Sequence, residues 1–115
     1  VFHCHNNKLT SLKGCPKEVG GFYCYGNQLT SLEGSPIIID GNLYIEHNPI
    51  SIIDSSIEIK GEISIDDTNF DDRIKSLSQD KLKILFEHGV DYDIFRKDGS
   101  INDYRLERLF KDFNI

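Results

Sequence analysis

The stretches KLTSLKGCPKEVGGFYC (residues 8–24) and QLTSLEGSPIIIDGNLYI (residues 28–45) decide the fold, because one is a near copy of the other. Both contain Leu-Thr-Ser-Leu-x-Gly-x-Pro and, after it, a short segment in which apolar side chains alternate with others. The Gly and the Pro predict a turn. The alternation predicts a short strand with every second residue inward. The chain therefore repeats one structural unit at a fixed interval.

The interval is regular over four units, with steps of 20, 21 and 20 residues between the first inward positions of the strands: Phe2, Phe22, Leu43 and Ile63. An asparagine keeps the same register in three units: Asn7, Asn27 and Asn48. An Asn side chain at a bend can satisfy backbone groups that water cannot reach. Each strand is expected to pair in parallel with its copy, because a single coil cannot bury its apolar edge.

One unit reads Val19-x-x-Phe22-x-Cys24-x-x-Asn27-x-Leu29, with Cys as a small hydrophobe in an aliphatic position. This pattern resembles the L-x-x-L-x-L-x-x-N-x-L unit of the leucine-rich repeat family. The short form, with its Leu-Thr-Ser-Leu-x-Gly-x-Pro phrase, is similar to repeats of bacterial and bacteriophage proteins. The resemblance covers residues 1–70 and implies an α/β solenoid whose leucine-rich repeat coils form a short parallel β-sheet. It implies a binding role and, by itself, no enzymatic activity.

The repeat pattern stops at Phe70, so a different element is expected to cover the last coil. Residues 71–115 are predicted to form a small, mainly helical C-terminal cap. Ser78 is a candidate N-cap for a helix that ends at Gly89. A second helix is indicated by apolar residues at i, i+3, i+4 and i+7, namely Leu106, Leu109, Phe110 and Phe113.

Two finer features are predicted in the cap. Residues 90–94 alternate apolar and acidic side chains, which predicts a short extended segment before a turn at residues 97–99. Glu107 and Lys111 are four residues apart on the polar side of the second helix, and we expect them to form an ion pair.

The formal net charge of −6 is divided evenly along the chain. Residues 1–62 contain four Lys and Arg against seven Asp and Glu, and residues 63–115 contain nine against twelve, so each part carries −3. Neither part has the basic surface that is typical of nucleic-acid binding. No apolar run approaches the roughly 20 residues that a membrane-spanning helix needs. Neither a nucleic acid nor a membrane is expected as a partner.

The three cysteines, Cys4, Cys15 and Cys24, form no even set, which favours a reducing compartment. A cytoplasmic location is predicted, in the host cytoplasm if the protein is encoded by a phage. Cys4 and Cys24 fall at equivalent inward positions of adjacent coils, where a disulfide is conceivable, but we expect them to pack as reduced residues. The sequence contains no Met, and further repeats are expected before Val1.

The spacing of the potential ligands argues against a metal site. The alternation directs His3 and His5 outward and Cys4 into the core, so the three cannot bind one ion; His3 and His5 alone could bind a divalent ion only weakly. Around Gly99 the sequence echoes half of a calcium loop, yet Arg105 stands where the bidentate Glu belongs. We predict no metal, no cofactor and no catalytic residue, and hence no enzyme.

The remaining candidates are the outward-facing strand residues, with Ser64 and Asp66 further along. The six predicted to bind a partner protein are His3, His5, Tyr23, Tyr25, Tyr44 and Glu46. Adjacent strands lie about 4.8 Å apart, so these side chains form one contiguous aromatic and polar patch. Tyr is enriched at interface hot spots because it buries a large area and keeps a hydroxyl group for hydrogen bonding.

Three interpretations of the function stay open. The first is a protein–protein interaction module that binds through the strand face. The second is a phage or bacterial inhibitor or effector that blocks a host protein through its acidic surface, for which strongly salt-sensitive binding would be evidence. The third is the targeting arm of an enzyme whose catalytic part lies outside this chain.

Overall fold

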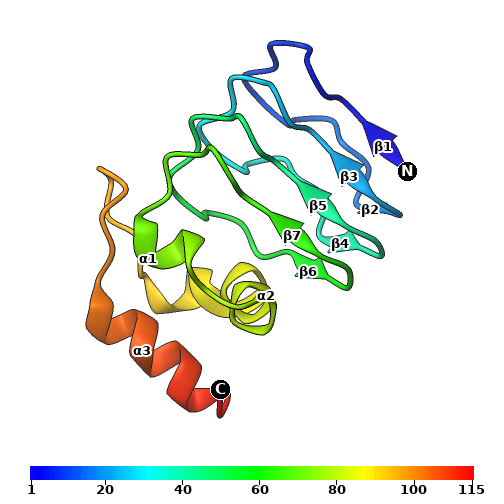
Figure 1. Ribbon diagram of the computed structural model, residues 1–115. Coiled ribbons are helices and arrows are strands. Elements are labelled where there is room, and N and C mark those ends of the chain that lie inside the picture. The colour runs from blue at the N-terminus through cyan, green and yellow to red at the C-terminus, as the bar shows by residue number, and fades with distance from the viewer.

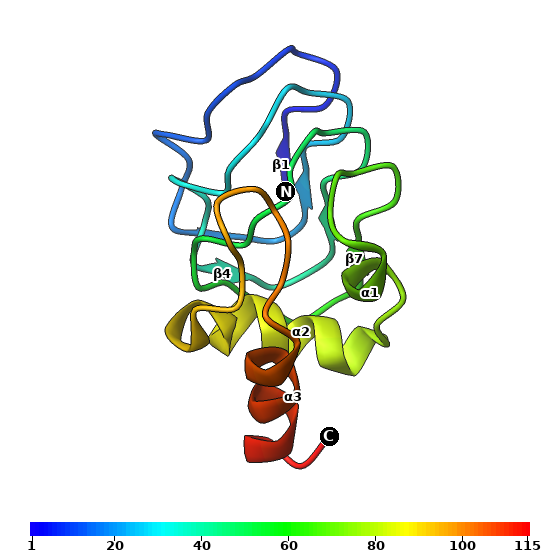
Figure 2. The same ribbon diagram turned by 90° about the vertical axis from the view of Figure 1, so that its left-hand side faces the viewer.

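The computed structural model describes residues 1–115 and shows an α/β fold with two parallel sheets and a helical segment at the C-terminal end (Figures 1 and 2). The first sheet has the order β1-β3-β5-β7, and the second has the order β2-β4-β6. The strands of the first sheet are β1 Phe2–His3, β3 Phe22–Tyr23, β5 Leu43–Tyr44 and β7 Ile63–Ser64. The strands of the second are β2 Glu18–Val19, β4 Ile38–Ile39 and β6 Glu58–Ile59. We use "coil" for the chain from one strand of the first sheet to the next.

The first sheet has the register that the sequence predicts. Phe22 pairs with Phe2 on one side and with Leu43 on the other, and Leu43 pairs in turn with Ile63. Phe22 and Leu43 are fully buried, whereas the next residue of each strand is only partly buried. The predicted parallel pairing and the predicted inward positions are therefore confirmed.

The second sheet was not predicted. Each of its strands has two residues, and Val19, Ile39 and Ile59 supply the buried one. The other residue is Glu18 in β2 and Glu58 in β6, both exposed. A two-residue strand of this kind is too short to show alternation. The signal that does exist is the period itself, since Glu18 pairs with Ile38 and Ile38 with Glu58.

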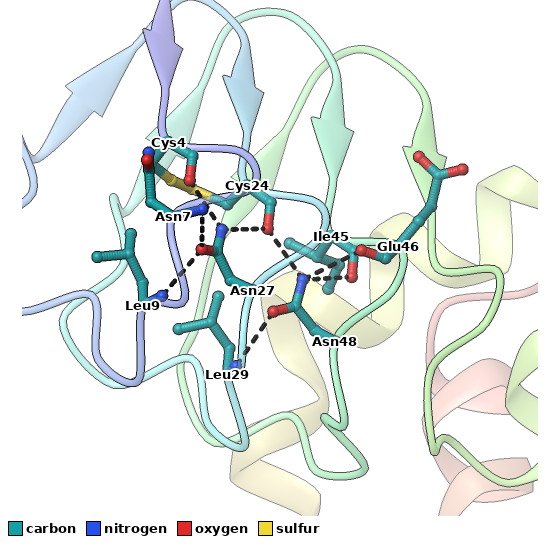
Figure 3. The surroundings of a disulfide bond; sticks show 9 residues. All are labelled: Cys4, Asn7, Leu9, Cys24, Asn27, Leu29, Ile45, Glu46 and Asn48. Carbon is teal, nitrogen blue, oxygen red and sulfur yellow. Dashed lines mark hydrogen bonds between the residues drawn. A yellow bond between two sulfur atoms is a disulfide. The ribbon is translucent and has the colours of Figure 1, made fainter.

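The bends after β3 and β5 are held by buried side-chain amides, as the sequence predicts (Figure 3). The Asn27 Oδ1 accepts hydrogen bonds from the backbone N–H groups of Asn7 and Leu9, both at 2.9 Å. Its Nδ2 donates to the carbonyl oxygens of Cys4 and Cys24, at 2.8 and 3.1 Å. Asn27 thus joins two coils through backbone groups that would otherwise lack partners.

Asn48 repeats this arrangement one coil later. Its Oδ1 accepts from the Leu29 N–H at 3.1 Å, and its Nδ2 donates to the carbonyl oxygens of Cys24 and Ile45, at 2.9 and 3.0 Å. In the last coil the buried Thr68 takes the place of the asparagine and donates from Oγ1 to the Ile65 carbonyl oxygen at 2.6 Å. The polar ladder therefore continues one coil further than the asparagine register indicates.

The residue just before each of these positions has a positive φ. These residues are Asn6, Gly26, His47 and Asp67, with φ values of 58°, 71°, 56° and 53°. Left-handed backbone is accessible to Gly and, at lower cost than for other residues, to Asn, Asp and His. Each coil thus uses a residue type that permits the same sharp bend. After the last three bends the next side chain lies inside (Asn27, Asn48 and Thr68), whereas Asn7 after the first bend is exposed.

Four helical elements follow the last strand: α1 Asp72–Lys75, α2 Gln79–His88, the 3₁₀ helix η1 Gly89–Tyr92, and α3 Asp103–Asp112. The Oγ of Ser78 accepts from the Lys81 N–H at the start of α2, and Gly89 is the C-cap, so both predicted boundaries of this helix are confirmed. The predicted extended segment over residues 90–94 is wrong, because η1 continues the helical direction through residue 92. Alternation over these few residues favours a strand, but tertiary context overrides such a short local signal.

Helix α2 lies across the end of the molecule opposite to β1, against β6 and β7 (Figures 1 and 2). Its buried residues Leu82, Leu85 and Phe86 join the hydrophobic core. The side chain of Gln79 pairs with the edge strand β7, accepting from the Ile63 N–H at 2.8 Å and donating to the Ile63 carbonyl oxygen at 2.9 Å. The helix therefore covers apolar surface and also satisfies part of the sheet edge.

Helix α3 packs through the predicted stripe. Leu106, Leu109 and Phe110 are buried, and Phe113 is the C-cap. The predicted ion pair between Glu107 and Lys111 does not form. The Glu107 carboxylate lies 4.0 Å from the Arg73 guanidinium of α1, and the i,i+4 pair of this helix is Arg108–Asp112 at 3.2 Å.

The expectation that Cys4 and Cys24 stay reduced is wrong for this structure, in which they form a disulfide bond (Figure 3). Their equivalent inward positions on paired coils place the two Cα atoms 4.8 Å apart, within the range that disulfides require. Cys15 is free, and partial burial raises the pKa of its thiol. Because two of the three cysteines form a disulfide, the odd cysteine count does not favour a reducing compartment. The cytoplasmic location stays a prediction. None of the helices has the length and apolar character needed to cross a membrane.

Candidate binding surface on the strand face

The strand face is formed by side chains that alternate with core residues in the first sheet and just beyond it. Its eight members stand in two columns that run across the strands. The first column contains His3, Tyr23, Tyr44 and Ser64, and the second contains His5, Tyr25, Glu46 and Asp66. The register of the strands brings the members of each column next to one another. All six residues that the sequence nominates lie on this surface.

The first three residues of the first column form a continuous row of aromatic contacts. The rings of His3 and Tyr23 are nearly parallel, at 16°, with their centroids 5.0 Å apart. The rings of Tyr23 and Tyr44 are also 5.0 Å apart and are tilted by 52°. The hydroxyl oxygen of Tyr44 accepts a hydrogen bond from the Asn42 side chain at 3.1 Å. These contacts hold three ring systems in fixed positions on the surface.

The second column begins with two aromatic side chains and continues with two acidic ones. The rings of His5 and Tyr25 are stacked at 11°, with their centroids 4.7 Å apart. The Nδ1 of His5 is buried and has no hydrogen-bond partner. Beyond Tyr25 the column continues with two carboxylates, Glu46 and Asp66, and neither takes part in an ion pair. Figure 3 shows the Glu46 side chain directed away from the buried asparagines and out of the coil.

Two residues that the sequence reasoning missed complete this surface. Asn42 orients the Tyr44 hydroxyl group, as described above. His47 lies beside Glu46, and its Nδ1 lies 2.5 Å from Oδ2 of Asp67 in the next coil. Both His47 and Asp67 belong to the positive-φ positions, which keep the 20-residue step from 47 to 67. That shared register is the signal that could have identified the pair.

The second sheet carries a different kind of surface. Lys60 lies 3.2 Å from Asp40, and Asp40 is also hydrogen-bonded to Glu18. Donating a hydrogen bond to Asp40 raises the pKa of the Glu18 carboxyl group, while accepting hydrogen bonds from Glu18 and Lys60 lowers the pKa of Asp40. Lys60 thus pairs with Asp40, whereas the two carboxylates of the strand face form no ion pair.

Other hollows and ion sites are weaker candidates. A surface hollow of about 510 Å³ over α3 is lined by Tyr104 and by four charged residues of both signs: Glu107, Arg108, Lys111 and Asp112. A smaller one of about 180 Å³ lies where coil three meets η1. No group of three or more His, Cys, Asp or Glu side chains is placed to hold a metal ion.

The strand face is thus the surface on which rigid aromatic groups and unpaired charges meet. His3, His5, Tyr23, Tyr25, Tyr44 and Glu46 are brought together by strand register, and Asp66 adjoins them. Comparison with known proteins adds no relative: no protein-family model, no curated protein and no solved structure matches this chain.

Proposed function

We propose that the protein is a leucine-rich repeat solenoid with a helical C-terminal cap, and that it binds a partner protein through the strand face. Three features support the solenoid. The strand register follows the sequence period, buried Asn27 and Asn48 repeat one set of contacts, and α2 covers the last coil. A stack of coils that each contact only their neighbours presents an extended, regular surface that is well suited to binding.

The observation that carries the binding role is the ordered aromatic patch. Tyr23 contacts a ring on each side, since it stacks on His3 and also contacts Tyr44. Side chains that are already fixed lose little conformational entropy when a partner covers them. Tyr residues with one apolar face and a free or oriented hydroxyl group are typical of interface hot spots. The patch therefore combines large contact area with a low ordering cost.

The test is a double substitution, Tyr23→Ala with Tyr44→Ala. A partner is first captured from the source cells on the immobilised protein, then purified, and its affinity for both forms is measured by calorimetry. Each hot-spot Tyr is expected to contribute about 2 kcal/mol, so the double variant should lose about 4 kcal/mol and bind roughly 700-fold more weakly. The circular dichroism spectrum should not change, because both side chains lie outside the core.

The matched control is Tyr104→Ala, which removes the 73% exposed tyrosine of α3 and leaves the strand face intact. This variant should keep the affinity of the unmodified protein. If the double variant binds its partner at full strength, the strand face is not the binding surface. If only Tyr104→Ala weakens binding, the helical cap carries the contact instead.

A further inference from the structure

We propose that the strand face binds an arginine side chain of its partner, stacked on Tyr25 and paired with Glu46 and Asp66. This inference rests on the proposed function and names the chemistry of the contact. It concerns the second column, in which the aromatic stack ends and the two carboxylates begin. The occupant we infer is a guanidinium group presented by another protein.

The geometry of the stack supplies the first argument. His5 covers one face of the Tyr25 ring, with the two rings nearly parallel and 4.7 Å apart. That separation matches the spacing of about 4.8 Å between strands, so the stack runs along the column. The other face of the Tyr25 ring is therefore directed along the column toward the third coil, where the side chain is Glu46. The next planar group in this stack would lie beside that carboxylate.

Charge complementarity supplies the second argument. Glu46 and Asp66 occupy equivalent positions in neighbouring coils, because the His47 N–H donates to the Asp66 carbonyl oxygen and the Gly26 N–H donates to the Glu46 carbonyl oxygen. Like charges opposite one another on paired strands repel. The nearby Asp67 has His47 as its partner, but Glu46 and Asp66 have no cation. A positive group from a partner relieves that repulsion.

The combination favours arginine over lysine. A guanidinium group is planar, stacks on aromatic faces and binds carboxylates through paired N–H groups, whereas an ammonium group is a compact and strongly hydrated point charge. The site offers the second face of the Tyr25 ring and, beyond it, the carboxylates of Glu46 and Asp66. A guanidinium group can stack on such a ring and donate several hydrogen bonds to such carboxylates. An ammonium group would be attracted by the two carboxylates, but its contact with the Tyr25 ring would stabilise the complex less.

The first column shows why the site lies at Tyr25. There the second side of Tyr23 is taken by Tyr44, and the hydroxyl group of Tyr44 is already bonded to Asn42. The residue after Tyr44 in that column is Ser64, which carries no charge. The first column therefore gives apolar contact, and the second column gives the position for a cation.

The experiment is a titration of the ¹⁵N-labelled full chain, followed by NMR, with three acetylated and amidated tripeptides. They are Ala-Arg-Ala, Ala-Lys-Ala and the uncharged Ala-citrulline-Ala. We expect the arginine peptide to shift the amide signals of Tyr25, Glu46 and Asp66, with a dissociation constant at least about fivefold lower than that of the lysine peptide. The citrulline peptide should bind about tenfold more weakly than the arginine peptide. Equal binding of all three peptides, or shifts confined to α3, would overturn the inference.

Two variants test the named side chains. Glu46→Gln and Tyr25→Leu should each weaken binding of the arginine peptide about five- to tenfold. The control is Glu33→Gln, which neutralises an exposed carboxylate outside the strand face and should have no effect. Wild-type binding by both site variants would contradict the arginine site. Such a result would leave the proposed function standing if the Tyr23 and Tyr44 double variant still lost its protein partner, so the two failures are distinguishable.

Discussion

The coils and the C-terminal helices satisfy their backbone groups in opposite ways. In the coils, Asn27 and Asn48 contact backbone groups up to 23 and 24 residues away in sequence. In the helices, Ser78 and Asn102 each accept a hydrogen bond from the N–H group three residues ahead. One region depends on neighbouring coils, and the other is stabilised within single turns of the chain.

This difference predicts how far the loss of one side chain destabilises each region. A helix cap contributes locally, so its loss loosens one helix end. A buried amide that joins two coils leaves several groups without partners when it is removed, and the effect extends to both coils. Three substitutions, each with a comparison variant, test this contrast in descending order of effect. The measurements are the free energy of unfolding and the extent of the chain over which protection is lost.

Asn27→Ala should have the largest effect. It removes four hydrogen bonds and leaves the N–H groups of Asn7 and Leu9 without an acceptor. The free energy of unfolding should fall by about 3–5 kcal/mol, as expected when buried polar groups are orphaned. Urea denaturation measures the loss, and hydrogen exchange should show weaker protection in both the first and the second coil.

The control is Asn7→Ala. Asn7 keeps the same register but is exposed, and its side chain makes no hydrogen bond. Its substitution should change stability by less than about 0.5 kcal/mol, the usual range for surface positions. If the two variants lose equal stability, the buried amide is not what joins the coils.

Gly26→Ala should have an intermediate effect. Gly26 has a φ of +71°, and an added Cβ would meet the side chain of Asn6 in the preceding coil. The combined backbone strain and steric contact should lower the free energy of unfolding by about 2–3 kcal/mol. Thermal unfolding followed by circular dichroism would measure it.

Gly14→Ala separates the two causes. Its φ is +91°, but a Cβ at this position has nothing within 4 Å. This variant should show the backbone strain alone and lose about 1–2 kcal/mol. A loss at Gly14 as large as that at Gly26 would mean that close packing between coils contributes nothing at the bend.

Ser78→Ala should have the smallest effect. The Ser78 Oγ accepts from the Lys81 N–H at 3.3 Å, and loss of an N-cap costs about 1 kcal/mol. Hydrogen exchange should show the change confined to the first turn of α2. Ser35→Ala, at a half-buried Ser whose side chain makes no hydrogen bond, should have no comparable effect. Loss of protection throughout the coils after Ser78→Ala would contradict a local role for the cap.

Much of the fold could be predicted because residues at equivalent positions of the repeat pair with one another in neighbouring coils. The inward residues Phe22 and Leu43 and the buried Asn27 could be identified from the period alone. The second sheet could not, since Glu18-Val19 and Glu58-Ile59 are too short to show a strand pattern. The 3₁₀ helix over residues 89–92 could not be identified, because the alternation over residues 90–94 favours a strand.

The sequence predicts which residues form the strand face, but it does not predict how their side chains contact one another. Alternation placed Tyr23, Tyr25 and Tyr44 outward, and the structure brings them together. The stacking of His5 on Tyr25 and the bond between Asn42 and Tyr44 depend on side-chain rotamers, which a spacing pattern does not determine. The cysteine count favours reduced residues at positions 4 and 24, although the register that predicts the sheet also places Cys4 and Cys24 side by side, where they form the disulfide.

The residues with positive φ and the residues just before them are under different constraints on which amino acids can replace them. Asn6, Gly26, His47 and Asp67 are limited by backbone conformation to a few residue types. The residue just before each of them lies on the strand face and is free of that limit: His5, Tyr25, Glu46 and Asp66. Mutation can therefore change the side chains of the strand face, one coil at a time, while the backbone conformation of the adjacent bend restricts which residues can replace the bend residue. Variation among descendants of this gene should accumulate on one side of each bend residue and be suppressed on the bend itself.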